Sequence, residues 1–345
     1  MTAQKRLPAT EYLLLALAMA LRFYRLGAQS LWSDEGNSLA LARAGLAEIA
    51  ARTALDIHPP LYYWLLKGWL ALLGQSEFAA RSLSAVLGVL LAAMFVAAVS
   101  PFQVYYAQEA RMYMLLALLG TLCVWLAVTW WTATGSRRRW LPAGGYALAA
   151  AMGLYTQYAF PVVLAAINLT ALVALGRHRR RLGEWLALQA IPVALYAPWL
   201  PVAWRQVTTW PAPLEAASAG EVGLRIARTL SLGLSAPAAG DGWLWGFGGL
   251  LLLSFKFLSF KFKVQSSKFH TPRATHYALL VWLWLLLPVG LTAALFRPAY
   301  LKFLLVASPA FCLLVGAGIS SFKFKVQSSK FKVSSFRFQV SGFKF

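Results

Sequence analysis

The chain has 345 residues, of which 60% are hydrophobic and 12% are charged, with 32 basic and 11 acidic side chains and a formal net charge of +21. So few charged residues cannot cover the surface of a soluble protein of this length, so the composition excludes that class and indicates an all-α polytopic membrane protein. Two Lys- and Phe-rich segments, 254–275 and 321–345, contain no acid and supply more than half of the excess charge. Nucleic acid is therefore not an expected partner.

Apolar runs of spanning length, or nearly so, follow one another along the chain. A helix needs roughly 20 residues to cross a bilayer, and the runs lie at 11–26, 83–100, 112–132, 141–158, 160–176, 183–200, 242–258, 276–296 and 301–320. No small-residue cleavage site follows the charged residues at the N-terminus, so the first run is expected to remain as an uncleaved span. The pattern predicts a bundle of about nine or ten spans.

Basic clusters orient these spans, because cytoplasmic loops are enriched in Lys and Arg. The clusters at 136–140 and 177–181, both Lys/Phe segments, and Lys5 with Arg6 are predicted to be cytoplasmic. From Arg137 onward the predicted passes agree with this assignment. Upstream one pass is missing, so either Leu61–Gly74 also crosses or a span has been lost near 83–100.

With that pass restored, polar residues gather on the extracytoplasmic face. This face carries Asp34 and Glu35 in "LWSDEGNSLALARAG", Asp56 and His58 in "DIHPP", Glu109 and Arg111 in "AQEARMY", and Arg297, Tyr300 and Lys302 in "FRPAYLKF". Carboxylates, an imidazole and cations along one aqueous rim indicate a site that binds an anion and abstracts a proton. Each residue also has an ordinary explanation, such as a solvated loop acid or an arginine that extends to the membrane surface. Their recurrence on one side favours a site.

Four segments, in this order, resemble the GT-C superfamily of membrane glycosyltransferases, in particular the bacterial relatives of protein O-mannosyltransferases and the lipid A aminoarabinose transferases. The segments are "RFYRLGAQSLWSDEGNSLALA", "DIHPPLYYWLLKGWLALLGQSEFAARSLSAVLG", "SPFQVYYAQEARMYMLLALL" and "RPAYLKFLLVASPAFCLLVGAGI". The resemblance implies a GT-C-like helical bundle whose catalytic first loop is extracytoplasmic, in a bacterial-type inner membrane.

The resemblance also implies roles for individual residues. The family takes a sugar from a polyprenyl-phosphate carrier and gives it to a hydroxyl acceptor with inversion. Asp34 matches the catalytic base and Glu35 stands beside it as a second catalytic residue. Arg111 and Lys302 match the cations that stabilise the leaving lipid phosphate, and the further substrate-binding residues are His58, Glu109 and Tyr300. A divalent cation on Glu35 and His58 is also implied, although two residues are few ligands for a metal. Membrane lipids are the remaining expected partners.

The chain departs from the family pattern in two places. Leu83 to Ser100 looks like the start of one span fused to the end of the next, and a Lys/Phe insert interrupts a later span. We therefore expect a GT-C-like catalytic region at 1–253, an insert at 254–275, further spans at 276–320 and a repeat tail at 321–345. A rearranged, inactive family member stays open. So does a membrane transporter, although a transporter would place ionisable residues near span centres.

The insert and the tail share the sequence "FKFKVQSSKF", at 260–269 and 322–331. Its alternation of Phe and Lys has a period of two, which is more typical of a strand or a surface-bound segment than of a helix. These segments are either patches that bind anionic lipid or an acquired low-complexity insertion. A non-catalytic scaffold at the lipid surface would depend on them alone.

Overall fold

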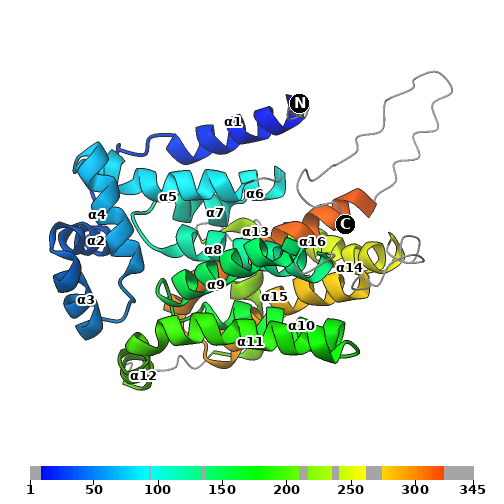
Figure 1. Ribbon diagram of the computed structural model, residues 1–345. Helices are drawn as coiled ribbons and strands as arrows, with labels where there is room; N and C mark the ends of the chain where they lie inside the picture. Colours follow the sequence, from blue (N-terminus) through cyan, green and yellow to red (C-terminus); the bar gives the residue numbers. More distant parts are fainter. Residues whose placement is uncertain are drawn as a thin grey trace, which may run out of the picture.

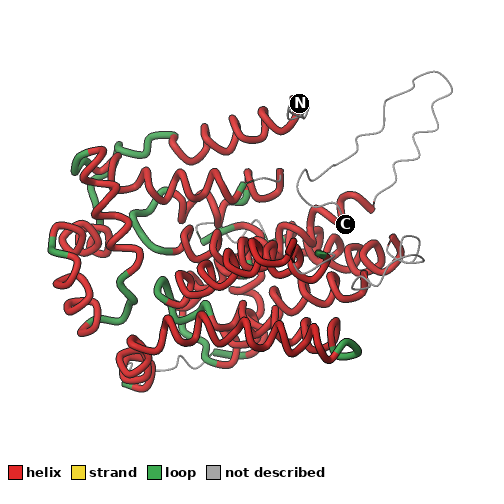
Figure 2. The backbone as a smooth tube through the Cα atoms, viewed as in Figure 1, coloured by secondary structure: helices red, strands yellow, loops and turns green. Residues whose placement is uncertain are grey.

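The computed structural model describes residues 9–92, 95–133, 137–209, 217–234, 241–261 and 274–321. All regular structure in these ranges is helical, and none of them contains a strand (Figure 2). The prediction of an all-α membrane protein is confirmed. The repeat tail predicted at 321–345 lies outside the described residues apart from Ser321.

The helices follow the chain in three groups (Figure 1). The first group is α1 (Ala9–Phe23), α2 (Ser33–Arg43), α3 (Leu46–Leu55), α4 (Leu61–Leu73), α5 (Glu77–Leu91), α6 (Phe95–Val99) and α7 (Pro101–Ala107). The second is α8 (Tyr113–Thr132), the 3-10 helix η1 (Arg137–Arg139), α9 (Trp140–Leu154), α10 (Pro161–Leu175), α11 (Arg179–Tyr196), the 3-10 helix η2 (Ala197–Trp199) and α12 (Leu200–Thr208). The third is α13 (Ala219–Leu232), α14 (Gly242–Lys261), α15 (Ala274–Ala294), the 3-10 helix η4 (Pro298–Val306) and α16 (Ser308–Ser321).

Within the described ranges, 3 helices are long and apolar enough to cross a membrane, or up to 4 if a bent pair counts as one span. They are Tyr113–Thr132, Arg179–Thr208, Thr275–Ala294 and the pair Tyr300–Val306 with Ser308–Ser320, which is bent by 60°. Shorter apolar helices are Leu61–Leu73, Pro161–Leu175 and Gly242–Ser254. Long uninterrupted helices are fewer than the nine or ten predicted spans because several apolar runs are divided or shortened. The chain is an integral membrane protein.

The apolar run 83–100 forms a helical hairpin and not a single span. Ala92, directly after α5, has non-helical backbone angles of φ −81° and ψ 45°. The two legs then meet, since Ala92 and Ala98 share a small buried cluster with Ala18 of α1. The chain therefore reverses between Ala92 and Phe95.

Contacts farther along the hairpin show that both legs reach the same end of the bundle. A Cβ atom placed on Gly88 of α5 would lie 2.8 Å from the Ala107 Cβ of α7. Nearer the open end, the Ser84 hydroxyl donates to the carbonyl oxygen of Arg111 at 3.1 Å. The segment that looked like a fused pair of spans enters and returns, and this return supplies the pass that charge counting found to be missing.

Arg22 of α1 stabilises the returning leg of this hairpin. The residue is fully buried, and its two terminal nitrogens donate to the carbonyl oxygens of Ala98 at 2.9 Å and Ala97 at 3.0 Å. Carbonyls in the last turn of a helix have no partner within it, and a cation there also complements the helix dipole. Ser100 then caps α7, with Pro101 at its first position. The backbone groups at this break are satisfied, as an apolar environment requires.

α8 lies in the middle of the bundle (Figure 1), and more than half of its side chains are buried. Near its end Trp131 packs edge-on against Trp185 of α11, with ring centroids 5.4 Å apart. The Trp284 indole of α15 donates to the carbonyl oxygen of Val306 at 2.8 Å. This bond attaches η4 to a long apolar helix and so fixes the position of the side chains on η4.

The two ends of the bundle differ in their elements. α2, α3 and α12 lie together at the end that is at the left of Figure 1, which we call the site end. There the Gln206 amide of α12 donates to the carbonyl oxygen of Thr53 at the end of α3, at 2.8 Å. The turn between α10 and α11 lies at the opposite end, which we call the basic end because it carries Arg177 to Arg181.

Part of the predicted insert at 254–275 belongs to regular helices. α14 continues through Ser254 to Lys261, and α15 begins at Ala274. The expectation that the Phe/Lys alternation suits a strand is therefore wrong for 254–261. A helix that is already formed extends at little cost because each added residue gains a backbone hydrogen bond. The remainder of the insert, 262–273, lies outside the described residues.

Candidate active site

Asp34 and Glu35 lie in the first turn of α2, and not in the open loop that the sequence suggested. Acidic side chains are favourable there because the helix dipole is positive at its N-terminus. Consecutive helical side chains point in different directions, and the two carboxylates accordingly differ in burial. Asp34 keeps 34% of its side chain exposed, whereas Glu35 keeps 1%.

Glu35 forms a buried, two-pronged ion pair with Arg81 of α5. The Arg81 Nε atom donates to Oε1 at 2.8 Å, and Nη2 donates to Oε2 at 2.6 Å. The Ala110 backbone N–H, between α7 and α8, donates to Oε1 at 2.9 Å. Both carboxylate oxygens are thus occupied by donors of the protein, and one side chain joins α2 to both ends of the hairpin.

Arg81 is a site residue that sequence reasoning missed. Besides Glu35, its guanidinium donates to the carbonyl oxygens of Leu26, Gln29 and Ser30 at 3.1, 2.7 and 3.1 Å, which fixes the connection from α1 to α2. The available signal was an arginine within "FAARSLSAVLG", since a charge at the edge of an apolar segment requires a partner. The sequence could not say which acid that partner is.

Asp34 pairs with Arg111, which is 77 residues away in the sequence. The Arg111 Nη1 atom lies 3.2 Å from the Asp34 Oδ2 atom and also donates to the Asp34 carbonyl oxygen at 3.3 Å. Arg111 is 5% exposed, and its Nε atom is buried without a hydrogen-bond partner. The pair therefore combines an accessible carboxylate with a buried cation that retains an unused donor.

Lys302 of η4 lies on the other side of an aromatic ring that Arg111 also contacts. The Lys302 Nζ atom is 5.7 Å from the centroid of the Tyr113 ring, and the Arg111 guanidinium carbon is 5.7 Å from the same centroid. Across the described ranges, no carboxylate forms an ion pair with Lys302. Two cations thus share the ring of Tyr113, an arrangement suited to a group with several negative oxygens.

Tyr300 is placed by a neighbour on its own short helix. The Arg297 guanidinium donates to the Tyr300 hydroxyl and lies 5.0 Å from its ring centroid. The Tyr300 ring also packs against Phe303, with centroids 5.2 Å apart. The predicted substrate-binding tyrosine is therefore held on η4, the same short helix that carries Lys302.

His58 is buried between α3 and α4, and neither ring nitrogen has a hydrogen-bond partner. Its Nδ1 atom lies 3.8 Å from the Asp56 Oδ2 atom, which is beyond hydrogen-bond distance. Burial lowers the pKa of His58, and the nearby charges of Arg111 and Lys302 lower it further, while Asp56 opposes the shift. The imidazole is therefore neutral at pH 7 and offers one donor and one acceptor.

The residues do not form an evident metal site. Among the side chains that the structure describes, no three His, Cys, Asp or Glu residues gather as a metal would require. Both Glu35 oxygens are already occupied, as described above. The divalent cation implied for Glu35 and His58 therefore does not fit these two residues.

Glu109 is a second buried carboxyl group in the same region, 8% exposed. Burial raises its pKa to about 7, and the neighbouring charge of Glu35 acts in the same direction, while Arg111 and Lys302 oppose it. Near neutral pH this group exists in both protonation states. The predicted residues Asp34, Glu109, Arg111 and Lys302 thus influence one another across α2, η4 and the α7–α8 connection.

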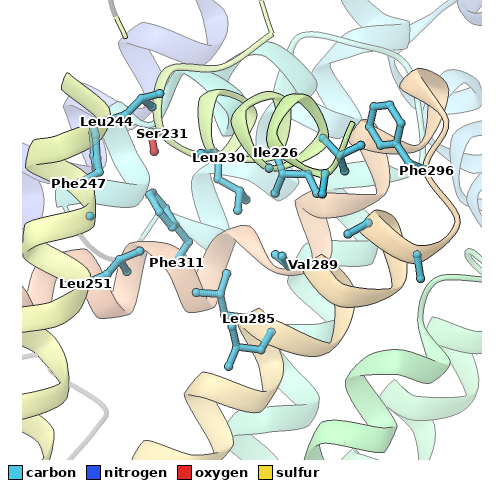
Figure 3. Close-up of a pocket in the computed structure, with 18 of the residues that line it drawn as sticks. Ile226, Leu230, Ser231, Leu244, Phe247, Leu251, Leu285, Val289, Phe296 and Phe311 are labelled. Atoms are coloured by element: carbon cyan, nitrogen blue, oxygen red, sulfur yellow. The ribbon is translucent and has the colours of Figure 1, made fainter. Parts of the chain in front are cut away.

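An apolar cavity of about 680 Å³ lies between α13, α14, α15 and α16. Figure 3 shows side chains of these helices pointing into it, among them Ile226, Leu230, Phe247, Leu285 and Phe311. Phe296, which also lines the cavity, directly precedes Arg297 and the helix η4 that carries Lys302. The cavity therefore leads from the apolar part of the bundle towards the cations of the site.

Comparison with solved structures shows which known fold this is. The chain is similar to ArnT from Cupriavidus metallidurans, solved bound to undecaprenyl phosphate, with a TM-score of 0.60 and 18% identity, covering 91% of this chain and 61% of that chain. The apo structure of that ArnT gives a TM-score of 0.44 and 16% identity, covering 90% of this chain and 76% of that chain. No protein-family model and no curated protein matches the sequence. The predicted GT-C-like fold is confirmed as an ArnT-like arrangement, and the chain spans 61% of the length of the first of these structures.

Proposed function

We propose that this chain transfers a sugar from a polyprenyl-phosphate carrier to a hydroxyl acceptor. The observation that carries the proposal is the pairing of the accessible Asp34 carboxylate with the buried Arg111, beside Lys302. A carboxylate next to two cations suits a reaction in which a hydroxyl loses a proton while a phosphate departs. The similar ArnT structure contains undecaprenyl phosphate, a carrier lipid of this class.

The proposed step is a single displacement. Asp34 accepts the proton of the acceptor hydroxyl, whose oxygen then attacks the anomeric carbon of the sugar. The bond from that carbon to the phosphate oxygen breaks, and the lipid phosphate leaves with the electron pair. One displacement inverts the anomeric centre. Arg111, through its unpaired Nε, and Lys302 stabilise the charge that develops on the phosphate. No step requires a metal ion.

Other residues are assigned to binding. Neutral His58, with both ring nitrogens unpaired, can exchange hydrogen bonds with sugar or acceptor hydroxyls. Tyr300 and Glu109 line the same region, and the apolar cavity beside η4 is suited to the polyprenyl chain. The carbonyl-rich connection held by Arg81 and Glu35 keeps Asp34 and Arg111 in place.

The proposal places the site on the extracytoplasmic face of a bacterial-type inner membrane. Its support is the separation of charge in the fold, because the arginine clusters at 137–139 and 177–181 belong to the basic end, opposite α2 and α3. Cytoplasmic loops carry such clusters. The reason to expect an inactive protein was the lost pass, and the hairpin removes that reason by returning Arg111 to Asp34.

Membranes that contain the full chain, supplied with polyprenyl-phosphate sugars, test the proposal. Transfer to an acceptor should disappear in Asp34→Asn, which keeps the side-chain size and removes the base. The matched control is Glu48→Gln, because Glu48 on α3 is half exposed and belongs to the same end. Full transfer by Asp34→Asn, at equal expression, would disprove the assignment of Asp34.

A further inference from the structure

At the basic end, the fold joins two arginine clusters that lie some forty residues apart in the sequence. We propose that this arginine patch, formed by Arg138, Arg139, Arg177, Arg179, Arg180 and Arg181, binds the phosphate headgroup of an anionic phospholipid. The proposal concerns a surface away from Asp34 and does not depend on the proposed transferase activity.

Two shared partners hold the clusters together. Arg139 and Arg180 both form ion pairs with Glu184 of α11, the second with Nε–Oε1 at 3.3 Å. Arg139 and Arg181 both lie over the Trp130 ring of α8, at 5.5 and 6.0 Å from its centroid. One carboxylate and one aromatic ring thus bring three arginines from separate segments onto one surface.

Arg181 has a structural role within the patch. Its Nη2 atom donates to the carbonyl oxygens of Trp131 and Ala133, at 3.1 and 3.2 Å, where α8 ends. Carbonyls at a helix C-terminus need such a donor, and the helix dipole favours a cation there. Arg181 and Arg139 therefore form the base on which the more exposed members are arranged.

The remaining members present unused charge. Arg138, Arg177 and Arg179 are exposed, and within the described ranges none of the three forms an ion pair with a carboxylate. Glu184 is the acid that the six arginines share, so the patch carries a large local excess of positive charge. Such an excess attracts an anion with several oxygen acceptors.

Apolar neighbours indicate that this anion belongs to a lipid. Trp140 and Leu141, directly after Arg139, are 76% and 86% exposed, and α9 begins there and continues into the bundle. Exposed Trp beside Arg is typical of the level at which membrane headgroups lie. A soluble anion would gain nothing from these two side chains, whereas a phospholipid would contact them with its upper acyl chain.

Competition between two lipids tests the proposal on the purified full chain. Phosphatidylglycerol and phosphatidylcholine are added together in detergent micelles, and the lipid retained by the protein is measured by native mass spectrometry. Since each arginine near an anionic headgroup is worth roughly 1 kcal/mol, about fivefold, the triple variant R138Q/R177Q/R179Q should lower the preference for phosphatidylglycerol up to roughly a hundredfold.

The control is the triple variant R25Q/R43Q/R52Q, which removes three exposed arginines from the other part of the chain. It should retain the preference for phosphatidylglycerol. An unchanged preference in R138Q/R177Q/R179Q, or an equal loss in the control, would overturn the proposal. Inorganic phosphate that displaces the bound lipid completely at millimolar concentration would show a free-anion site and would also overturn it.

Discussion

Arg111 and Asp34 lie on the same side of the bundle, with Nη1 of the arginine 3.2 Å from Oδ2 of the aspartate. Counting charges along the sequence left these residues on opposite faces, because one pass was missing. The hairpin of α5, α6 and α7 resolves this, since its returning leg ends just before Glu109 and Arg111. The two residues that the proposed chemistry needs are thus within contact distance although 77 positions separate them.

Loss of Arg111 should weaken the use of the donor. Arg111→Ala removes a buried cation that faces the site, and truncation of one partner of a buried charge pair costs roughly 2–5 kcal/mol. The expected result is a strong fall in kcat/KM for the polyprenyl-phosphate sugar. Arg111→Lys should recover part of it, because it restores the charge without the guanidinium fork. Equal donor dependence in wild type and Arg111→Ala would exclude Arg111 from the phosphate site.

The Glu35–Arg81 pair should determine stability more than any other ion pair at the site end. Glu35→Gln leaves the buried Arg81 guanidinium without its counter-ion, and breaking a buried pair in this way costs roughly 3–5 kcal/mol. Thermal unfolding in detergent should show a clear fall in Tm. Glu77→Gln on the same helix α5 is the control, because Glu77 is exposed and should leave Tm almost unchanged.

Arg22 should be needed to keep the hairpin folded. Arg22→Met retains much of the apolar stem but leaves the carbonyl oxygens of Ala97 and Ala98 without their donor, and each unsatisfied buried group costs roughly 1–3 kcal/mol. The expected result is a lower Tm together with weaker transfer activity, since Arg111 follows the hairpin. Arg25→Met, at an exposed position nearby, should behave as wild type; a similar fall in both variants would contradict the role given to Arg22.

Glu109 should make stability depend on pH. Its pKa is raised from the ordinary value of 4.5 to about 7 by burial, so the folded protein keeps a proton that the unfolded chain has lost. Stability contributed by this group is therefore complete below pH 4.5, falls as the pH rises to about 7, and stays constant above it. Glu109→Gln removes the dependence, so the Tm of the variant should rise relative to wild type between pH 5 and 8. Parallel Tm curves over this range would contradict the raised pKa.

Much of the fold class was predictable because it follows from composition. An excess of apolar residues in long runs admits only helices or closed barrels in a membrane, and the runs here have helical length. The grouping of Asp34, Glu109, Arg111 and Lys302 was also predictable, since charged residues that are rare in such a chain must share an aqueous face. For the same reason the basic clusters could be assigned to the opposite end.

The partners of individual residues were decided by the tertiary structure alone. Both acids of "SDEG" looked equivalent in the sequence, yet the helical turn of α2 directs Glu35 to Arg81 and leaves Asp34 accessible. The hairpin could not be read from the run 83–100 either, because its apolar residues fit one span as well as two short legs. What distinguishes the two is the donor that Arg22 supplies to Ala97 and Ala98. Hydropathy records how apolar a segment is, whereas its direction depends on which distant groups satisfy its backbone, and only the folded chain brings those groups together.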